Sequence, residues 1–160
     1  MARAVRRDRR VSARFLGVLA IAALAGCESR APQPPTLEHT EMTGGERLPF
    51  SAAVRVGPML YLSGQLGTDS SLALVPGGIG PETRQAMENI RGIVTRAGGS
   101  MDRIVKCTVM LADIAEWGAM NVEYVKFFPN RKPARSALGA SGLAMNARVE
   151  IECIAALEAV

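Results

Sequence analysis

The sequence is poor in histidine, and this shortage limits the chemistry that it can support. His39 is the only histidine among 160 residues. A metal centre or a Ser-His or Cys-His catalytic pair needs a rigidly held imidazole. His39 instead lies in a polar stretch, from residue 28 to about 47, that follows no helical or strand-like pattern. Neither kind of site is therefore expected.

Basic charge is also lacking where a nucleic-acid surface would need it. The chain has 19 basic and 15 acidic residues, with a net charge of +4. Six of the arginines and only one acidic residue precede Cys27, so the rest of the chain carries 13 basic and 14 acidic residues. Binding to phosphates requires basic charge gathered on the folded part. Nucleic acid is therefore not expected as a partner.

The apolar run near the start of the chain is too short to cross a bilayer. It covers residues 15–24, about half of the roughly 20 residues that a membrane span requires. It follows an arginine-rich start and ends in small residues, which is the layout of a signal peptide. The segment Leu24-Ala25-Gly26-Cys27 resembles a bacterial lipobox, in which the cysteine receives a diacylglyceryl group and becomes the new N-terminus.

This resemblance predicts three parts of the chain. Residues 1–26 are expected to be a lipoprotein signal peptide, residues 27–47 a lipidated tether, and residues 48–160 the folded domain. The protein would be exported and held on a membrane through Cys27, facing the periplasm or the cell exterior. An ordinary secretory signal with an incidental cysteine is the alternative.

The folded part shows the periodicity of alternating strands and helices. The expected elements are a hairpin around Gly57-Pro58, a helix from Pro81 to Gly98-Gly99, a strand over 104–111, an amphipathic helix over 117–128 and a strand over 149–153. Trp117, Met120, Tyr124 and Phe128 of the second helix are predicted to be core residues. This order predicts an α+β fold in which two helices cover one face of a single sheet. The other face is then left to self-association, so an oligomer is expected.

The cysteines after Cys27 lie within apolar, strand-like runs. Cys107 and Cys153 are expected to be buried free thiols, as is usual in such runs. An oxidising compartment would permit a disulfide as the alternative.

Five motifs in the folded part agree in order with those of one known family. They are Pro49-Phe50-Ser51, the stretch from Gly57 to Tyr61-Leu62-Ser63-Gly64-Gln65, Asn121 to Phe127-Phe128, Pro133-Ala134-Arg135-Ser136, and Val149-Glu150-Ile151-Glu152. Together they resemble the Rid (reactive intermediate deaminase, YjgF-like) family. The resemblance runs from about residue 48 to the C-terminus, with a shortened stretch between Phe128 and Pro133.

The resemblance implies a fold, an assembly and a reaction. The fold would be chorismate-mutase-like, with three chains forming a homotrimer and ligand clefts between them. The reaction would be hydrolysis of small 2-imino or 2-enamino acids to 2-keto acids and ammonia. It would need no metal or organic cofactor, because the imine is already electrophilic. Arg135 would grip the substrate carboxylate, and Glu150 would position the attacking water. Phe50, Ser63 and Asn121 would help to bind the substrate.

Two positions depart from the family pattern. Phe50 stands where many deaminating members have a tyrosine, and Ala137 stands where a cysteine is common. The main alternative function is a lipoprotein of the same fold that binds a small carboxylate without turning it over. A ribonuclease, reported for some animal members, conflicts with the balanced charge of the domain.

Overall fold

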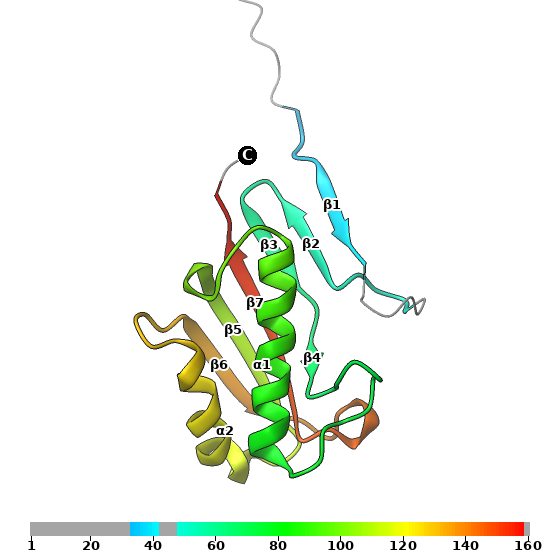
Figure 1. Cartoon of the computed structure of the whole chain (residues 1–160), viewed down its shortest axis with the longest axis vertical. Helices are drawn as coiled ribbons and strands as arrows, with labels where there is room; N and C mark the ends of the chain where they lie inside the picture. Colours follow the sequence, from blue (N-terminus) through cyan, green and yellow to red (C-terminus); the bar gives the residue numbers. More distant parts are fainter. Residues whose placement is uncertain (1–32, 42–47, 159–160) are drawn as a thin grey trace, which may run out of the picture. The chain divides into compact units, whose positions relative to one another are not determined.

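Seven strands form one mixed sheet in the computed structural model (Figure 1). The structure describes residues 33–41 and 48–158. The strands are β1 (Leu37–Thr40), β2 (Ala53–Val56), β3 (Met59–Leu62), β4 (Gln65–Leu66), β5 (Ile104–Leu111), β6 (Ala134–Gly139) and β7 (Val149–Ala156). Their order in the sheet is β1-β2-β3-β7-β5-β6, with β4 also paired to β7. The β5–β6 pair is parallel, and the other pairs are antiparallel.

Two α-helices and four short 3-10 helices connect these strands. They are α1 (Ile79–Arg96), α2 (Trp117–Tyr124), η1 (Met101–Arg103), η2 (Ile114–Glu116), η3 (Val125–Phe127) and η4 (Ala144–Asn146). The helix α1 includes Pro81 in its first turn, where the missing proline N–H costs nothing. It is followed by Gly98 with a φ of 81°, a conformation that favours glycine at a helix end. The predicted hairpin, both helices and both long strands are confirmed.

Both helices lie on the same face of the sheet (Figure 1). The buried apolar side chains of the helices and the strands form one core between these two layers. Met87, Ile90 and Val94 of α1 are fully buried there, each stabilising the fold by roughly 1.5–3 kcal/mol. From the sheet, Ile151 and Cys153 of β7 are buried at 0% and 1% exposure. The α+β fold with two helices on one face of a mixed sheet is therefore confirmed.

Part of the segment that was predicted to be a tether forms a strand instead. Residues 37–40 form β1, which pairs with β2 through the register Leu37↔Val56 and His39↔Val54. The alternation of this strand was hidden because three of its four residues are exposed and polar residues occupy most of it. His39 is consequently held in a strand, and its Nδ1 lies 3.2 Å from the Ser51 hydroxyl oxygen.

The expectation of free thiols is also wrong, because Cys107 and Cys153 form a disulfide. The two residues lie directly opposite each other in the antiparallel pairing of β5 with β7, with 4.1 Å between their Cα atoms. The sequence places both cysteines in strands but does not give the register between the strands. That register decides whether the two sulfur atoms meet.

Trp117 differs from the other members of the predicted aromatic stripe. Met120, Tyr124 and Phe128 are at most 4% exposed, whereas Trp117 is 46% exposed. It is the first residue of α2, so its side chain lies at the margin of the helix layer instead of within the core.

The predicted signal peptide and Cys27 lie outside the described residues. Among the residues that the structure does describe, neither α-helix has the length and apolar character needed to cross a membrane.

Candidate active site

Arg135 and Asn121, both predicted to bind substrate, are brought into direct contact. Arg135 lies on the edge strand β6, and its Nη1 donates a hydrogen bond to Asn121 Oδ1 of α2 at 2.6 Å. Both side chains are half-buried. The amide oxygen fixes one edge of the guanidinium. Among the residues that the structure describes, Arg135 donates no other side-chain hydrogen bond, so its remaining N–H groups are available to a ligand.

Two aromatic rings flank the same guanidinium. The Arg135 Cζ lies 4.8 Å from the centre of the Tyr124 ring and 5.6 Å from that of Trp117. Burial raises the pKa of Tyr124 to about 12, although the positive charge of Arg135 opposes that rise. The phenol is therefore neutral at ordinary pH. The sequence pattern predicted that Trp117 and Tyr124 lie on one face of a helix. It did not predict that both rings contact Arg135.

The charge on Arg135 is not balanced by a carboxylate within the described ranges. The ion pairs there join Arg84 and Lys126 to Glu123, Arg91 to Glu88, and Arg148 to Glu116. The contacts of Arg135 are an amide oxygen and two ring faces, which are neutral. A half-buried guanidinium with neutral neighbours attracts an anion, and a planar carboxylate matches its fork of N–H donors.

Glu150 lies against the backbone of Gly64. A Cβ atom added to Gly64 would overlap Oε1 of Glu150 and would lie 2.8 Å from its Cδ. The register explains this approach, because Leu66 of β4 pairs with Glu150 of β7. Because glycine has no side chain, position 64 leaves room for the Glu150 carboxylate.

Ser63 anchors the segment that carries Phe50. Its hydroxyl donates to the Ser51 carbonyl oxygen at 2.7 Å, and its backbone N–H donates to the Ala52 carbonyl oxygen at 3.0 Å. Phe50 is 49% exposed beside this segment. Ser63, Phe50 and the Glu150–Gly64 contact thus belong to one part of the chain, around the end of β3. The substrate contacts expected of Ser63 and Phe50 stay predictions.

Arg135 and Glu150 lie on opposite faces of the sheet. Arg135 pairs in register with Cys107, which pairs with Cys153, so all three face the helices. Glu150 is three residues before Cys153 and therefore points to the face that the helices leave uncovered. A single chain thus presents two halves of the predicted site, the Arg135 half with Asn121 and the Glu150 half with Gly64.

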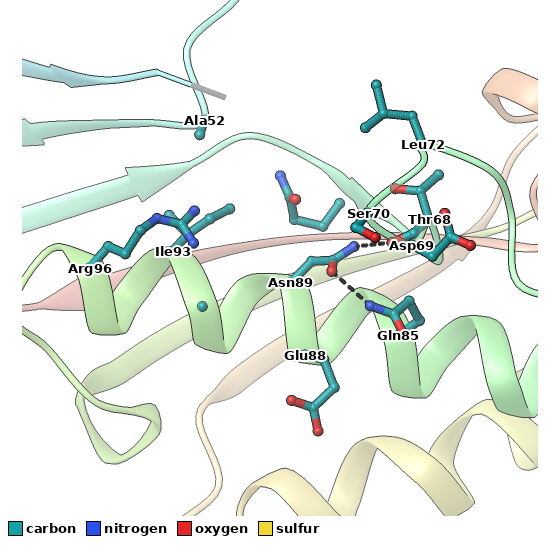
Figure 2. Close-up of a pocket in the computed structure, with 12 residues that line it drawn as sticks. Ala52, Thr68, Asp69, Ser70, Leu72, Gln85, Glu88, Asn89, Ile93 and Arg96 are labelled. Atoms are coloured by element: carbon teal, nitrogen blue, oxygen red, sulfur yellow. Dashed lines mark hydrogen bonds between the residues drawn. The ribbon is translucent and has the colours of Figure 1, made fainter. Parts of the chain in front are cut away.

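A cavity of about 420 Å³ lies elsewhere, between α1 and the loop after β4 (Figure 2). None of the predicted site residues lines it. Asn89 in its wall donates to the carbonyl oxygens of Leu66 and Thr68 at 3.1 and 2.9 Å. These bonds hold the loop to the helix, so the cavity is better explained by loop packing than by catalysis. In the described part of the chain, no three histidine, cysteine or acidic side chains are grouped as a metal site would require.

Comparison with known proteins identifies the family of the chain. The sequence profile of the family described as endoribonuclease L-PSP matches residues 45–157. The chain belongs to this family. Proteins with similar sequences include the mouse 2-iminobutanoate/2-iminopropanoate deaminase, which is 44% identical over 108 residues, or 67% of this chain and 80% of the mouse protein. The corresponding goat deaminase is 46% identical over 67% of this chain and 79% of its own length.

Solved structures of similar proteins have the same fold. A Rid-family protein of Yersinia pestis superimposes with a TM-score of 0.72 at 32% identity, covering 76% of this chain and all of that chain. TdcF of E. coli, solved with bound serine, gives a TM-score of 0.67 at 27% identity, covering 79% of this chain and all of that chain. The predicted Rid-like fold is therefore confirmed.

Proposed function

We propose that this protein hydrolyses small 2-imino acids, and their 2-enamino tautomers, to 2-keto acids and ammonia. The observation that carries the proposal is Arg135, a half-buried guanidinium whose neighbours are neutral and which is oriented by Asn121. The names of the similar mammalian deaminases support the same reaction. The substrate is a small carboxylate, which is what an Arg135 fork binds best.

The residues divide the reaction between them. Arg135 holds the substrate carboxylate through two parallel hydrogen bonds and so fixes the position of the neighbouring C=N bond. Glu150 orients water and transfers protons while water adds to the imine carbon. The C–N bond of the resulting aminoalcohol then breaks, the nitrogen leaves as ammonia, and a 2-keto acid remains. The imine is already electrophilic, so these steps need no electron sink.

We further propose that the complete site forms between copies of the chain, in a homotrimer. The opposite placement of Arg135 and Glu150 supports this assembly, since neither half can reach the other through its own sheet. The uncovered face also carries apolar side chains near Glu150, because Met110 pairs with Glu150 and Leu138 pairs with Met110. Leu138 is 45% exposed and Tyr61 is 46% exposed in the single chain. Contact with another copy would bury this surface.

The imine-hydrolysis proposal is tested by generating 2-imino acids with an L-amino-acid oxidase and trapping unreacted imine with semicarbazide. The wild-type protein should lower the trapped imine below the buffer value. Arg135→Ala should reduce kcat/KM by about 100-fold, because it removes two charge-assisted hydrogen bonds worth roughly 1.5 kcal/mol each. Arg91→Ala is the control, since Arg91 also stacks on a ring, that of Phe127, but lies outside the predicted site.

Equal rates for the wild type and buffer across several amino acids would refute the deaminase proposal. Carboxylate binding by the wild type that Arg135→Ala abolishes would then favour the alternative, a non-catalytic carboxylate-binding lipoprotein. The name endoribonuclease in the family description raises RNA cleavage as another activity. The 13 basic and 14 acidic residues after Cys27 give little support to RNA binding.

The shared site predicts that two inactive variants can complement each other. Arg135→Ala and Glu150→Gln chains are coexpressed, and mixed trimers are separated by different affinity tags. In each mixed trimer, an intact Arg135 half should face an intact Glu150 half at one site, which is about a third of the sites. Each variant alone stays near its own residual rate. Mixed trimers that are no more active than either parent would place both halves of the site in one chain.

We also propose that the protein is an exported lipoprotein anchored through Cys27, facing the periplasm or the cell exterior. Leu24-Ala25-Gly26-Cys27 behind an apolar run supports this location, as does the core disulfide, a bond typical of oxidising compartments. In cells, the wild type should sediment with membranes and incorporate labelled palmitate, and Cys27→Ser should do neither. Unchanged labelling of Cys27→Ser would disprove the lipidation site.

A further inference from the structure

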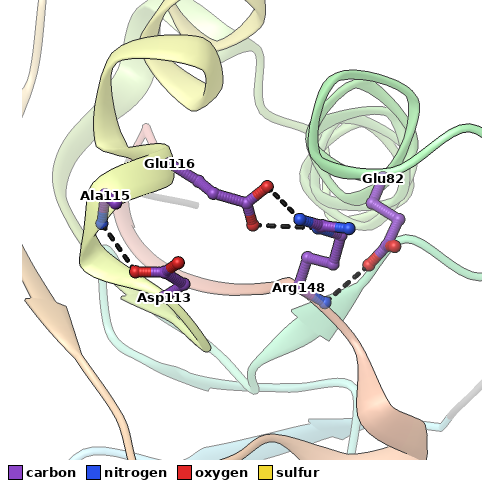
Figure 3. A network of polar contacts seen from close by, with 5 residues as sticks. All are labelled: Glu82, Asp113, Ala115, Glu116 and Arg148. Carbon is purple, nitrogen blue, oxygen red and sulfur yellow. Dashed lines mark hydrogen bonds and ion pairs between the residues drawn. The ribbon is translucent and has the colours of Figure 1, made fainter.

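We propose that Arg148 is a positioning residue that sets the place of Glu150 by joining three elements where β7 begins (Figure 3). The proposal rests on the function proposed for Glu150 and adds residues that the sequence motifs did not single out. Arg148 immediately precedes β7 and lies two residues before Glu150. Its guanidinium, its N–H and its carbonyl group are all engaged.

Each of these groups binds a different element. The Arg148 backbone N–H donates to Glu82 Oε2 of α1 at 2.8 Å, and the Arg148 carbonyl oxygen accepts from the Ala112 N–H, just after β5, at 3.0 Å. Its Nε donates to Glu116 Oε2 at 2.9 Å, and its Nη2 binds Glu116 Oε1. Figure 3 shows the Arg148 side chain reaching Glu116 and its backbone facing Glu82. The start of β7 therefore has little freedom to shift.

Glu82 also contacts the end of β4, the strand that pairs with β7 at Glu150. The residue is 5% exposed, and a Cβ atom added to Gly67 would lie 2.5 Å from its Cα and 2.7 Å from its carbonyl oxygen. Gly67 directly follows β4, the strand that pairs with Glu150 and follows Gly64. Glu82 thus packs against the exit of β4 and binds the entrance of β7. Glu150 lies on β7 and Gly64 directly precedes β4, so these two strands position both partners of the Glu150–Gly64 contact.

Glu116 connects the Arg148 side chain to the Arg135 half of the site. It directly precedes Trp117, whose ring lies 5.6 Å from the Arg135 guanidinium carbon. Within one chain, the Arg148–Glu116 ion pair therefore links the strand of Glu150 to the helix that flanks Arg135.

A second ion pair provides a matched control. Arg84 of α1 binds Glu123 of α2, with side-chain exposures of 56% and 10%, against 49% and 17% for Arg148 and Glu116. Both pairs join separate elements, and both arginines are half-exposed. Neither Arg84 nor Glu123 touches a residue of the predicted site in the hydrogen bonds and ion pairs of the described residues. The two pairs should therefore cost similar stability but differ in their effect on catalysis.

The test compares Arg148→Met, Arg148→Lys and Arg84→Met in the full chain. Arg148→Met should lower kcat by about 10-fold through misplacement of Glu150. KM should change less than about threefold, because Arg148 does not contact Arg135 and the bond from Arg135 to Asn121 is kept. Arg148→Lys keeps one charged contact to Glu116 and should recover part of the loss. Arg84→Met should leave kcat unchanged at a similar melting temperature.

Crystal structures of the two methionine variants give a readout that does not depend on activity. The Glu150 carboxylate should move away from Gly64 in Arg148→Met and stay in place in Arg84→Met. Equal kcat values for both variants, or an unmoved Glu150, would overturn the positioning role. An inactive wild type would instead refute the deaminase function, and the crystallographic comparison would still decide the role of Arg148.

Discussion

Replacing Glu150 by glutamine should lower kcat for imine hydrolysis by about 100-fold or more, because general acid–base catalysis contributes roughly 10²–10⁴-fold to such reactions. Glutamine has nearly the same shape as glutamate but cannot take a proton from water at neutral pH. The substrate carboxylate is held by Arg135, on the other half of the site, so KM should change little. The effect would be measured with the semicarbazide assay at several substrate concentrations.

Gly64→Ala tests whether the placement of Glu150 matters as well as its charge. The added methyl group would overlap Oε1 of Glu150, which must then turn away while the carboxyl group itself is kept. An intermediate loss of kcat is expected, since a displacement of about 1 Å can cost up to about 100-fold. If Glu150→Gln keeps more than half of the wild-type kcat, the catalytic role of Glu150 must be abandoned.

Loss of the Cys107–Cys153 disulfide should destabilise the domain by about 4 kcal/mol and lower its melting temperature by roughly 15 °C. The bond joins residues separated by 46 positions, so it removes much of the freedom of the unfolded chain. Both cysteines are at most 1% exposed, so a reductant can reach the sulfur atoms only when the domain opens. Urea unfolding with and without dithiothreitol, after long equilibration, measures the difference.

Cys153→Ala provides the control for the reductant itself. This variant cannot form the bond, so dithiothreitol should leave its unfolding midpoint unchanged. A wild-type midpoint that is equally insensitive to dithiothreitol, together with two alkylatable thiols in the unfolded protein, would show that the disulfide does not form.

Local sequence patterns were sufficient to predict much of the fold. Gly57-Pro58 between two apolar runs gave the hairpin, and Pro81 with the pair Gly98-Gly99 bounded α1 closely. The alternation at the end of the chain placed Val149 and Ile151 inside and Glu150 outside. These features depend on neighbouring residues, which the sequence displays directly.

Features that depend on distant pairings could not be derived in the same way. The strand β1 is recognisable only through its register with β2, and the disulfide only through the register of β5 with β7. The stacking of Tyr124 and Trp117 on Arg135 requires α2 to pack beside β6. The motifs named Arg135 and Glu150 together, yet the sequence did not show that a single chain keeps them on opposite faces.

The pairing of β1 with β2 also sets how far the domain could travel from a membrane. Since Leu37 is already part of the sheet, only residues 28–36 separate the domain from the proposed lipid on Cys27. Fully extended, such a spacer reaches about 35 Å. With the proposed lipid in place, the domain would stay within a layer of about that thickness beside the bilayer. It would then act only on imines that enter this layer.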